Sequence, residues 1–300
     1  MRTQINWMLH NYCTSECSYC PTRLRGGSIP RGILEYIEVT TQLIDHYELL
    51  DRKIDWSFNG GEPLDMFDFP MMLKLCKERG GIIDLTTNGG KLWLDWWAIE
   101  PYIDTIHLSY HYWQNPNLIQ FIIQAFQKSG KKIDIVVPIR PTYFDVDLKR
   151  ALDVESKFNI VVSKSVLYKE ADQSLGMYKY EDYQLRIMHG EELVEKHKHD
   201  QKITFAERFK EKLDANPSFT GQLCNLGIEK LNISPEGWVR GSNCNTTQFG
   251  NIWVNNAKVV SDAEKAQRNL NKLQLPTTPT QCVMTSCIDE SDQQITKFKL

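Results

Sequence analysis

The stretch Asn11-Tyr-Cys-Thr-Ser-Glu-Cys-Ser-Tyr-Cys20 places three cysteines within eight residues. Cys13, Cys17 and Cys20 come directly after the apolar run from Ile5 to Leu9. Three thiols this close together indicate a metal site. A closed structural zinc site normally has four protein ligands, whereas an iron–sulfur cube held by three thiolates keeps one iron open to a small molecule. The stretch therefore predicts an iron–sulfur site that can bind a ligand.

The composition is that of a globular chain. Its 300 residues are 41% hydrophobic, enough for a sizeable core in one large domain or in one domain with an appendage. The formal net charge of −3 gives no broad cationic surface and disfavours a nucleic-acid partner. No apolar run approaches the roughly 18 residues of a membrane span, and the N-terminus lacks the apolar core of a secretory signal. We therefore expect no membrane partner and a cytoplasmic location.

Residues 4–165 alternate short apolar runs with longer amphipathic stretches, a pattern typical of repeated β-α units around a parallel sheet. In barrels of such units, the loops at the carboxyl ends of the strands build the site. Helices are expected over Ile33–Tyr47, Asp68–Arg79 and Leu118–Ser129. Six strands are expected, at Gln4–Leu9, Lys53–Phe58, Ile82–Thr87, Thr105–Tyr110, Lys132–Pro138 and Asn159–Ser163.

Two further motifs begin where an expected strand ends. Asn59-Gly-Gly-Glu-Pro63 follows the second strand; its paired glycines let the backbone approach a ligand closely, and Glu62 can accept hydrogen bonds from an ammonium group. Thr86-Thr-Asn-Gly-Gly90 follows the third strand, and a plain strand-to-helix turn is the competing interpretation of it.

The C-x3-C-x2-C spacing, with Tyr19 just before the last cysteine, resembles the signature of the radical S-adenosylmethionine (SAM) enzymes. The resemblance implies a partial (β/α)6 TIM-like barrel in which Cys13, Cys17 and Cys20 hold a [4Fe–4S] cluster. The open iron of that cluster would take the amino and carboxylate groups of SAM. The second motif resembles the family's segment for the SAM amino group, and the third resembles its segment along the nucleoside. The implied cofactor-binding residues are Tyr19, Gly60, Gly61, Glu62, Pro63, Thr87 and Asn88.

The fourth and fifth strands supply weaker candidates. Ser109 and His111 share one face of a pleated strand, and if that face is the barrel interior both side chains lie over the cluster. Ser109 is then a cofactor-binding candidate and His111 a catalytic one, although a single histidine is more often structural. Arg140, after the fifth strand, presents a planar pair of donors suited to the carboxylate of SAM or of a substrate. A surface ion pair is the alternative for Arg140.

Four more cysteines follow at Cys224, Cys244, Cys282 and Cys287, here called the C-terminal cysteine group. Lys230–Ile233, the turn Ser234-Pro-Glu-Gly237 and Trp238–Arg240 predict a β-hairpin between the first two of these cysteines, with another short strand at Phe249–Trp253.

This arrangement resembles the SPASM extension of the radical SAM family or its shorter form, twitch. The resemblance implies one auxiliary [4Fe–4S] cluster with every iron held by protein. Zinc accepts four thiolates equally well. The four-residue gap between Cys282 and Cys287 is wider than the common two, which leaves open that another ligand replaces one of them.

We place a domain boundary near residue 200, with the barrel in residues 1–200 and the auxiliary-cluster extension in residues 201–300. The charged run Glu191–Asp200 is expected to be a solvated helix face and not a metal site. Cys76 lies alone in a helical pattern and is expected to be a buried structural thiol.

The resemblance implies an enzyme that cleaves SAM reductively and removes a hydrogen atom from its substrate with a 5′-deoxyadenosyl radical. Oxidation through the auxiliary cluster would follow, in peptide maturation or in dehydrogenation of a small molecule or nucleotide. An electron donor such as flavodoxin or ferredoxin is the implied partner. Because the first strand begins close to Met1, we expect no leader-peptide-binding domain ahead of it. A redox-neutral rearrangement, cyclisation or epimerisation is the alternative reaction, and a non-enzymatic zinc-binding scaffold is the alternative from another class.

Overall fold

The structure is a computed structural model. It describes residues 1–15, 17–20, 26–29, 31–90, 93–167, 178–200, 207, 210–211, 214–241, 248–253, 273–282, 287 and 290–298. The expected ligand Cys244 lies outside the described residues.

One nine-stranded sheet organises the molecule, with the strand order β10-β9-β8-β1-β2-β3-β4-β5-β6. Strands β1 to β6 run parallel to their neighbours. They confirm the six expected strands, with ends that differ by a few residues at most. Their bounds are Arg2–Met8 (β1), Lys53–Asn59 (β2), Ile82–Thr87 (β3), Thr105–Ser109 (β4), Lys132–Pro138 (β5) and Val162–Ser165 (β6).

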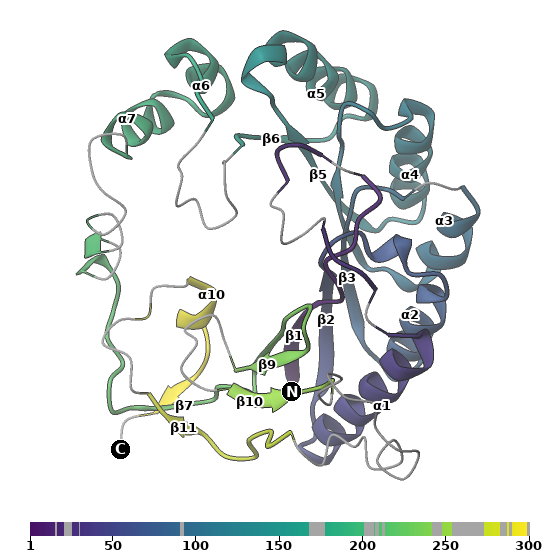
Figure 1. Cartoon of the computed structure of the whole chain (residues 1–300), viewed down its shortest axis with the longest axis vertical. Coiled ribbons are helices and arrows are strands. Elements are labelled where there is room, and N and C mark those ends of the chain that lie inside the picture. Colours follow the sequence, from purple (N-terminus) through teal and green to yellow (C-terminus); the bar gives the residue numbers. More distant parts are fainter. Residues whose placement is uncertain are drawn as a thin grey trace.

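Helices α1 to α5 connect these strands and lie along one side of the sheet (Figure 1). In α4, Asn115 accepts a hydrogen bond from the Asn117 amide (2.9 Å) and Pro116 takes the first helical position, so both N-terminal signals act together. The three expected helices are confirmed. The bounds are Ile33–Leu49 (α1), Phe69–Glu78 (α2), Trp93–Ile99 (α3), Pro116–Lys128 (α4) and Phe144–Phe158 (α5), with short 3-10 helices at Pro63–Asp65, Glu100–Tyr102 and Pro141–Tyr143.

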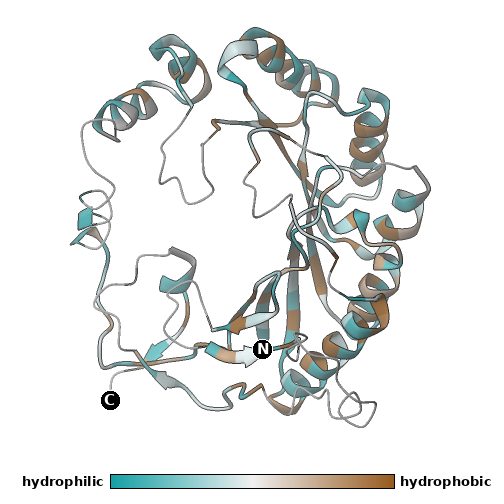
Figure 2. Ribbon diagram, in the orientation of Figure 1, coloured by the Kyte–Doolittle hydropathy of each residue, from teal (hydrophilic) through white to brown (hydrophobic). Residues whose placement is uncertain are grey.

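The two faces of the parallel sheet have opposite character. Alternate residues such as Trp7, Phe58 and Leu108 are fully buried under α1 to α5. Figure 2 shows this as apolar ribbon in the central strands and helices with both apolar and polar turns. The residues between them, such as Ser57 and Asp84, are only half-buried. Parallel sheets usually have two apolar faces, so the polar second face is suited to a polar ligand.

The predicted hairpin is confirmed as β8 (Lys230–Ile233) and β9 (Trp238–Arg240), which pair antiparallel. Strand β10 (Gln248–Asn251) pairs with β9. The sequence did not predict where the hairpin lies: β8 pairs in parallel with β1 and extends the barrel sheet. The domain boundary near residue 200 stays a prediction.

A second, three-stranded sheet contains β7 (Leu223–Cys224) between β11 (Thr280–Gln281) and β12 (Lys297–Phe298). A buried ion pair of 2.8 Å between Lys230 of β8 and Asp292 of α10 (Glu290–Gln293) links this part to the main sheet. Helices α6 (Asp182–His189) and α7 (Glu191–Asp200) lie away from the α1–α5 layer (Figure 1). Among the described residues, none of the helices combines the length and apolar character needed to cross a bilayer.

Candidate cofactor site

The cysteine loop, residues 11–20, leaves the carboxyl end of β1 and lies against the loop that leaves β2. The Leu9 amide donates to the Asn59 carbonyl (2.9 Å), the Gly61 amide to His10 (2.7 Å) and the Glu62 amide to Tyr12 (2.9 Å). Backbone hydrogen bonds therefore fix the two motifs relative to each other.

Close packing of these loops explains the paired glycines. Gly60 has φ = +135°, in a region that favours glycine. A Cβ on Gly61 would lie 1.8 Å from the Tyr12 carbonyl oxygen, and one on Gly60 would lie 2.5 Å from that of His10. The glycines thus let one loop approach the other, where the sequence had suggested an approach to a ligand.

Glu62 joins the loop after β2 to the end of β3. Its side chain is buried and accepts hydrogen bonds from the Leu64 amide (3.0 Å), the Thr87 hydroxyl (2.6 Å) and the Asn88 amide (2.7 Å). Burial raises the pKa of Glu62 to about 7, against the lowering effect of these donors. All three donors come from the protein, so the expected contact with an ammonium group stays a prediction.

Asn88 brings the third motif to the cysteine loop. Its side-chain amide donates to Cys13 Sγ (3.7 Å) and to Ser15 Oγ (3.3 Å). On the other side, Asp65 accepts from the Thr14 amide (2.7 Å) and hydroxyl (3.0 Å). The segment Thr86–Gly90 is therefore not only a strand-to-helix turn, because its Asn88 side chain contacts the cysteine loop at Cys13.

The end of β4 also reaches the cysteine loop. His111 Nδ1 and the Tyr19 hydroxyl share a hydrogen bond of 2.7 Å. Trp113 Nε1 donates to Cys17 Sγ (3.1 Å). Burial, with a smaller contribution from Arg150, lowers the pKa of His111 to about 4. The imidazole is therefore neutral at pH 7. Ser109 is half-buried, on the polar face of the sheet.

Arg140 lies at the end of β5 and contacts a carboxylate of the protein itself. Its Nε and Nη2 bond the fully buried Asp147 at 2.8 and 2.9 Å, and its backbone amide donates to the same side chain (2.9 Å). The guanidinium also lies over the rings of Tyr112 (3.7 Å) and Tyr143 (4.4 Å). Arg140 does form an ion pair, but with a buried carboxylate and not at the surface as the alternative had it. A contact with a ligand carboxylate stays a prediction.

The chemistry of the cysteine loop fits an iron–sulfur cluster. Three thiols lie on one loop, outside any disulfide, and Asn88 and Trp113 direct N–H donors at two of the sulfurs. Within the described ranges, no three His, Cys, Asp or Glu side chains stand close enough together to hold a metal ion. In an iron–sulfur cube the three thiolates bind three different irons, so their sulfurs need not lie as close together as the ligands of a single ion.

Of the three described members of the C-terminal cysteine group, Cys224 lies in the small sheet and Cys282 directly follows its strand β11. Cys224 of β7 is buried and lies opposite Thr280 of β11. The Cys282 amide donates to Gln222 (2.8 Å), and the Cys287 amide donates to Pro217 (2.8 Å). Their arrangement does not by itself form a ligand set among the described residues.

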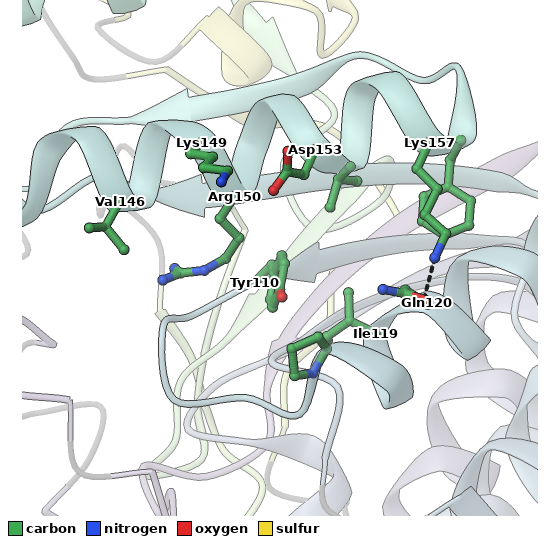
Figure 3. A pocket seen from close by; sticks show the side chains of 11 residues that line it. Tyr110, Ile119, Gln120, Val146, Lys149, Arg150, Asp153 and Lys157 are labelled. Atoms are coloured by element: carbon green, nitrogen blue, oxygen red, sulfur yellow. Dashed lines mark hydrogen bonds between the residues drawn. The ribbon is translucent and has the colours of Figure 1, made fainter.

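A pocket of about 260 Å³ lies elsewhere, between α4 and α5 (Figure 3). Tyr110 lies under the guanidinium of Arg150 (5.4 Å), and Lys157 Nζ donates to Gln120 Oε1 (2.6 Å). The pocket belongs to the helix-covered side of the sheet and contains none of the expected cofactor-binding residues.

Comparison with known proteins identifies the architecture. No family model and no curated protein matches the sequence. Among solved structures, Streptococcus suis SuiB bound to S-adenosylmethionine matches with a TM-score of 0.52 and 17% identity. This chain shares the fold of SuiB. The match covers 83% of this chain and 63% of the SuiB chain, so it spans less than two thirds of that protein.

Two further solved structures match this chain. SuiB bound to its precursor peptide SuiA gives a TM-score of 0.50 at 18% identity, over 83% of this chain and 62% of that one. The protein anSMEcpe with bound AdoMet gives 0.48 at 13% identity, over 84% of this chain and 78% of that one. At these identities the likeness to SuiB concerns the fold alone.

Proposed function

We propose that this chain is a radical SAM enzyme that abstracts a hydrogen atom from a polar substrate. The observation that carries the proposal is the meeting of three motifs from β1, β2 and β3. Asn88 contacts Cys13, and Glu62 accepts hydrogen bonds from both Thr87 and Asn88. The fold shared with SuiB, which was solved bound to S-adenosylmethionine, supports it.

Each part of the site has a role in this proposal. Cys13, Cys17 and Cys20 would hold a [4Fe–4S] cluster. Reductive cleavage of SAM into methionine and a 5′-deoxyadenosyl radical is the chemistry that such a cluster supplies when it is bound. Glu62 keeps the loops after β2 and β3 together, which orients the backbone of Gly60, Gly61 and Pro63 for the SAM amine.

Aromatic side chains partly cover the cysteine loop, although Trp113 itself is 39% exposed. Tyr19, His111 and Trp113 form a run of stacked rings, with ring centroids 5.9 and 5.6 Å apart. A neutral His111 suits this position because it adds no charge beside a cluster. Exclusion of water protects a reactive radical from side reactions.

The C-terminal cysteine group would hold the auxiliary cluster in a twitch or SPASM-type extension. Four thiolates from Cys224, Cys244, Cys282 and Cys287 would leave no iron open to substrate, so this cluster would accept an electron. Net oxidation of the substrate follows from that role. Zinc in the same site would favour a redox-neutral rearrangement or epimerisation.

Two observations bear on the substrate. The half-buried polar face of the barrel sheet suits a polar molecule. The match to SuiB bound to precursor peptide SuiA favours a peptide side chain, and a small polar molecule such as a nucleotide or amino sugar is the second candidate. A flavodoxin or ferredoxin would deliver the electron.

Anaerobic purification followed by incubation with SAM and dithionite tests the proposal. We expect a brown, iron-containing protein that releases 5′-deoxyadenosine, detected by mass spectrometry. With a deuterated candidate substrate, deuterium in 5′-deoxyadenosine identifies the attacked position. A colourless, zinc-loaded protein that leaves SAM intact would instead support the zinc-binding scaffold.

A further inference from the structure

We propose that Trp113 tunes the reduction potential of the cluster at the cysteine loop through its hydrogen bond to Cys17. This inference rests on the proposed function, because it requires Cys17 to ligate the cluster. In this role Trp113 is a positioning residue that acts through Cys17.

The hydrogen bond has favourable geometry. Trp113 Nε1 lies 3.1 Å from Cys17 Sγ, and the Cys17 side chain is buried. An indole offers one donor and no acceptor, so this contact uses the whole polar capacity of the side chain. Among the described tryptophans, Trp7, Trp56 and Trp253 have buried indole nitrogens without a partner, and the N–H of Trp96 goes to a carbonyl.

The short connection between β4 and α4 fixes the position of Trp113. Gln114, which is buried, accepts from the His111 backbone amide through its side chain, and its own amide donates to the His111 carbonyl (3.3 Å). Asn115 then caps α4. These hydrogen bonds hold the backbone at Trp113 beside the cysteine loop.

Stacking adds a second restraint. The His111 ring lies parallel to the Trp113 ring, with an interplanar angle of 6°, and is also stacked with the Tyr19 ring at 25°. Tyr19 is the residue before Cys20, so the same run of rings starts and ends at the cysteine loop. The run therefore holds the indole N–H in the direction of Cys17.

A hydrogen bond to a cluster-ligating sulfur stabilises the extra negative charge of the reduced cluster and raises its potential. Trp113→Phe removes the donor and keeps an aromatic ring for stacking. We expect the reduction equilibrium to shift about tenfold toward the oxidised form, which is a decrease of about 59 mV for one electron. Trp97→Phe, at an exposed tryptophan of α3, is the matched control and should leave the potential unchanged.

Potentiometric titration of the cluster's EPR signal measures the shift in reduction potential. It is done in a Cys282→Ala/Cys287→Ala background, so that only the cluster at the cysteine loop remains. An unchanged potential in Trp113→Phe, with the cluster present, overturns the inference and leaves the proposed function intact. A parent protein without any iron–sulfur signal overturns both.

A measurement on the unmutated tryptophan covers the case in which Trp113→Phe loses its cluster. In protein labelled with ¹⁵N at the indole nitrogens, hyperfine spectroscopy of the reduced cluster should detect a ¹⁵N coupling from Trp113. Its absence in cluster-containing protein contradicts the hydrogen bond whatever the variant does.

Discussion

The two cysteine regions differ in how the protein supports them. The cysteine loop after β1 is bonded to loops from β2, β3 and β4, all of which leave one large sheet over a continuous core. Cys224 belongs to a cluster of three buried residues with Leu226 and Ile295, and its strand is two residues long. Where few other contacts stabilise a region, the free energy of metal binding supplies much of its folding free energy. We therefore expect the first region to keep its fold without a cluster and the second to depend on one.

The largest effect is expected from removing the three thiols of the cysteine loop. The parent should carry about 8 iron per chain, from two four-iron clusters, and Cys13→Ala/Cys17→Ala/Cys20→Ala should keep about 4 and lose SAM cleavage. Circular dichroism should be nearly unchanged, since the loop is held by backbone bonds. Cys76→Ala, at a buried thiol of α2, should keep all the iron. Full iron in the triple variant would refute the ligand assignment.

Removing Cys282 and Cys287 tests the other region. SAM cleavage should persist in this double variant, because it uses only the cysteine loop, whereas net oxidation of the substrate should be lost. The backbone bonds of Cys282 and Cys287 to Gln222 and Pro217 do not need the side chains. A shift in the thermal transition beyond that of Cys76→Ala would show that the metal supports this region.

If the folded Cys282→Ala/Cys287→Ala variant oxidises substrate at the parental rate, the auxiliary site has only a structural role. The reaction would then be better described as redox-neutral.

Two glycine-to-alanine substitutions compare a site where the added Cβ would clash with one where it would meet no atom. Gly61→Ala places a Cβ 1.8 Å from the Tyr12 carbonyl and should cost about 3 kcal/mol of unfolding free energy. It should also weaken iron binding, since the cysteine loop has to move. Gly32→Ala, at the N-cap of α1 where an added Cβ would meet no atom within 4 Å, should cost only about 0.5–1 kcal/mol, because alanine is a poorer N-cap residue than glycine. Equal losses from denaturant unfolding of both variants would contradict the packing argument.

The smallest of these effects concerns Glu62. Glu62→Gln leaves one acceptor oxygen for three donors and should weaken SAM binding about ten- to hundredfold, equivalent to roughly 1.5–3 kcal/mol. Glu38→Gln, on the exposed face of α1, is the control. Unchanged SAM affinity in Glu62→Gln, measured by calorimetry, would exclude the role.

The same residue predicts a pH dependence. Burial raises the pKa of Glu62 to about 7 from its ordinary 4.5. Between pH 4.5 and pH 7, Glu62 is therefore protonated in the folded protein and ionised in the unfolded chain. Its contribution to stability is therefore present below pH 4.5 and is lost as the pH rises to 7, at about 1.4 kcal/mol per unit. The difference between parent and Glu62→Gln unfolding free energies should follow this slope, and a flat difference would show that Glu62 is ionised throughout.

The sequence by itself determined the repeating β-α architecture and the hairpin, because local periodicity and turn residues specify both. In the first strand, Ile5 and Trp7 alternate with the polar residues Gln4 and Asn6, as expected of a strand with one apolar face. The three motifs could be found for the same reason: each begins where a strand ends, and parallel strands end on one edge.

Only the tertiary structure decided which partners these residues take. Nothing local indicates that Glu62 accepts from Thr87 and Asn88, or that Trp113 donates to Cys17 from 96 residues away. Parallel pairing of β8 with β1 likewise joins segments over 200 residues apart. Such contacts depend on how the whole sheet is assembled, since long-range pairing leaves no periodic signal in either segment.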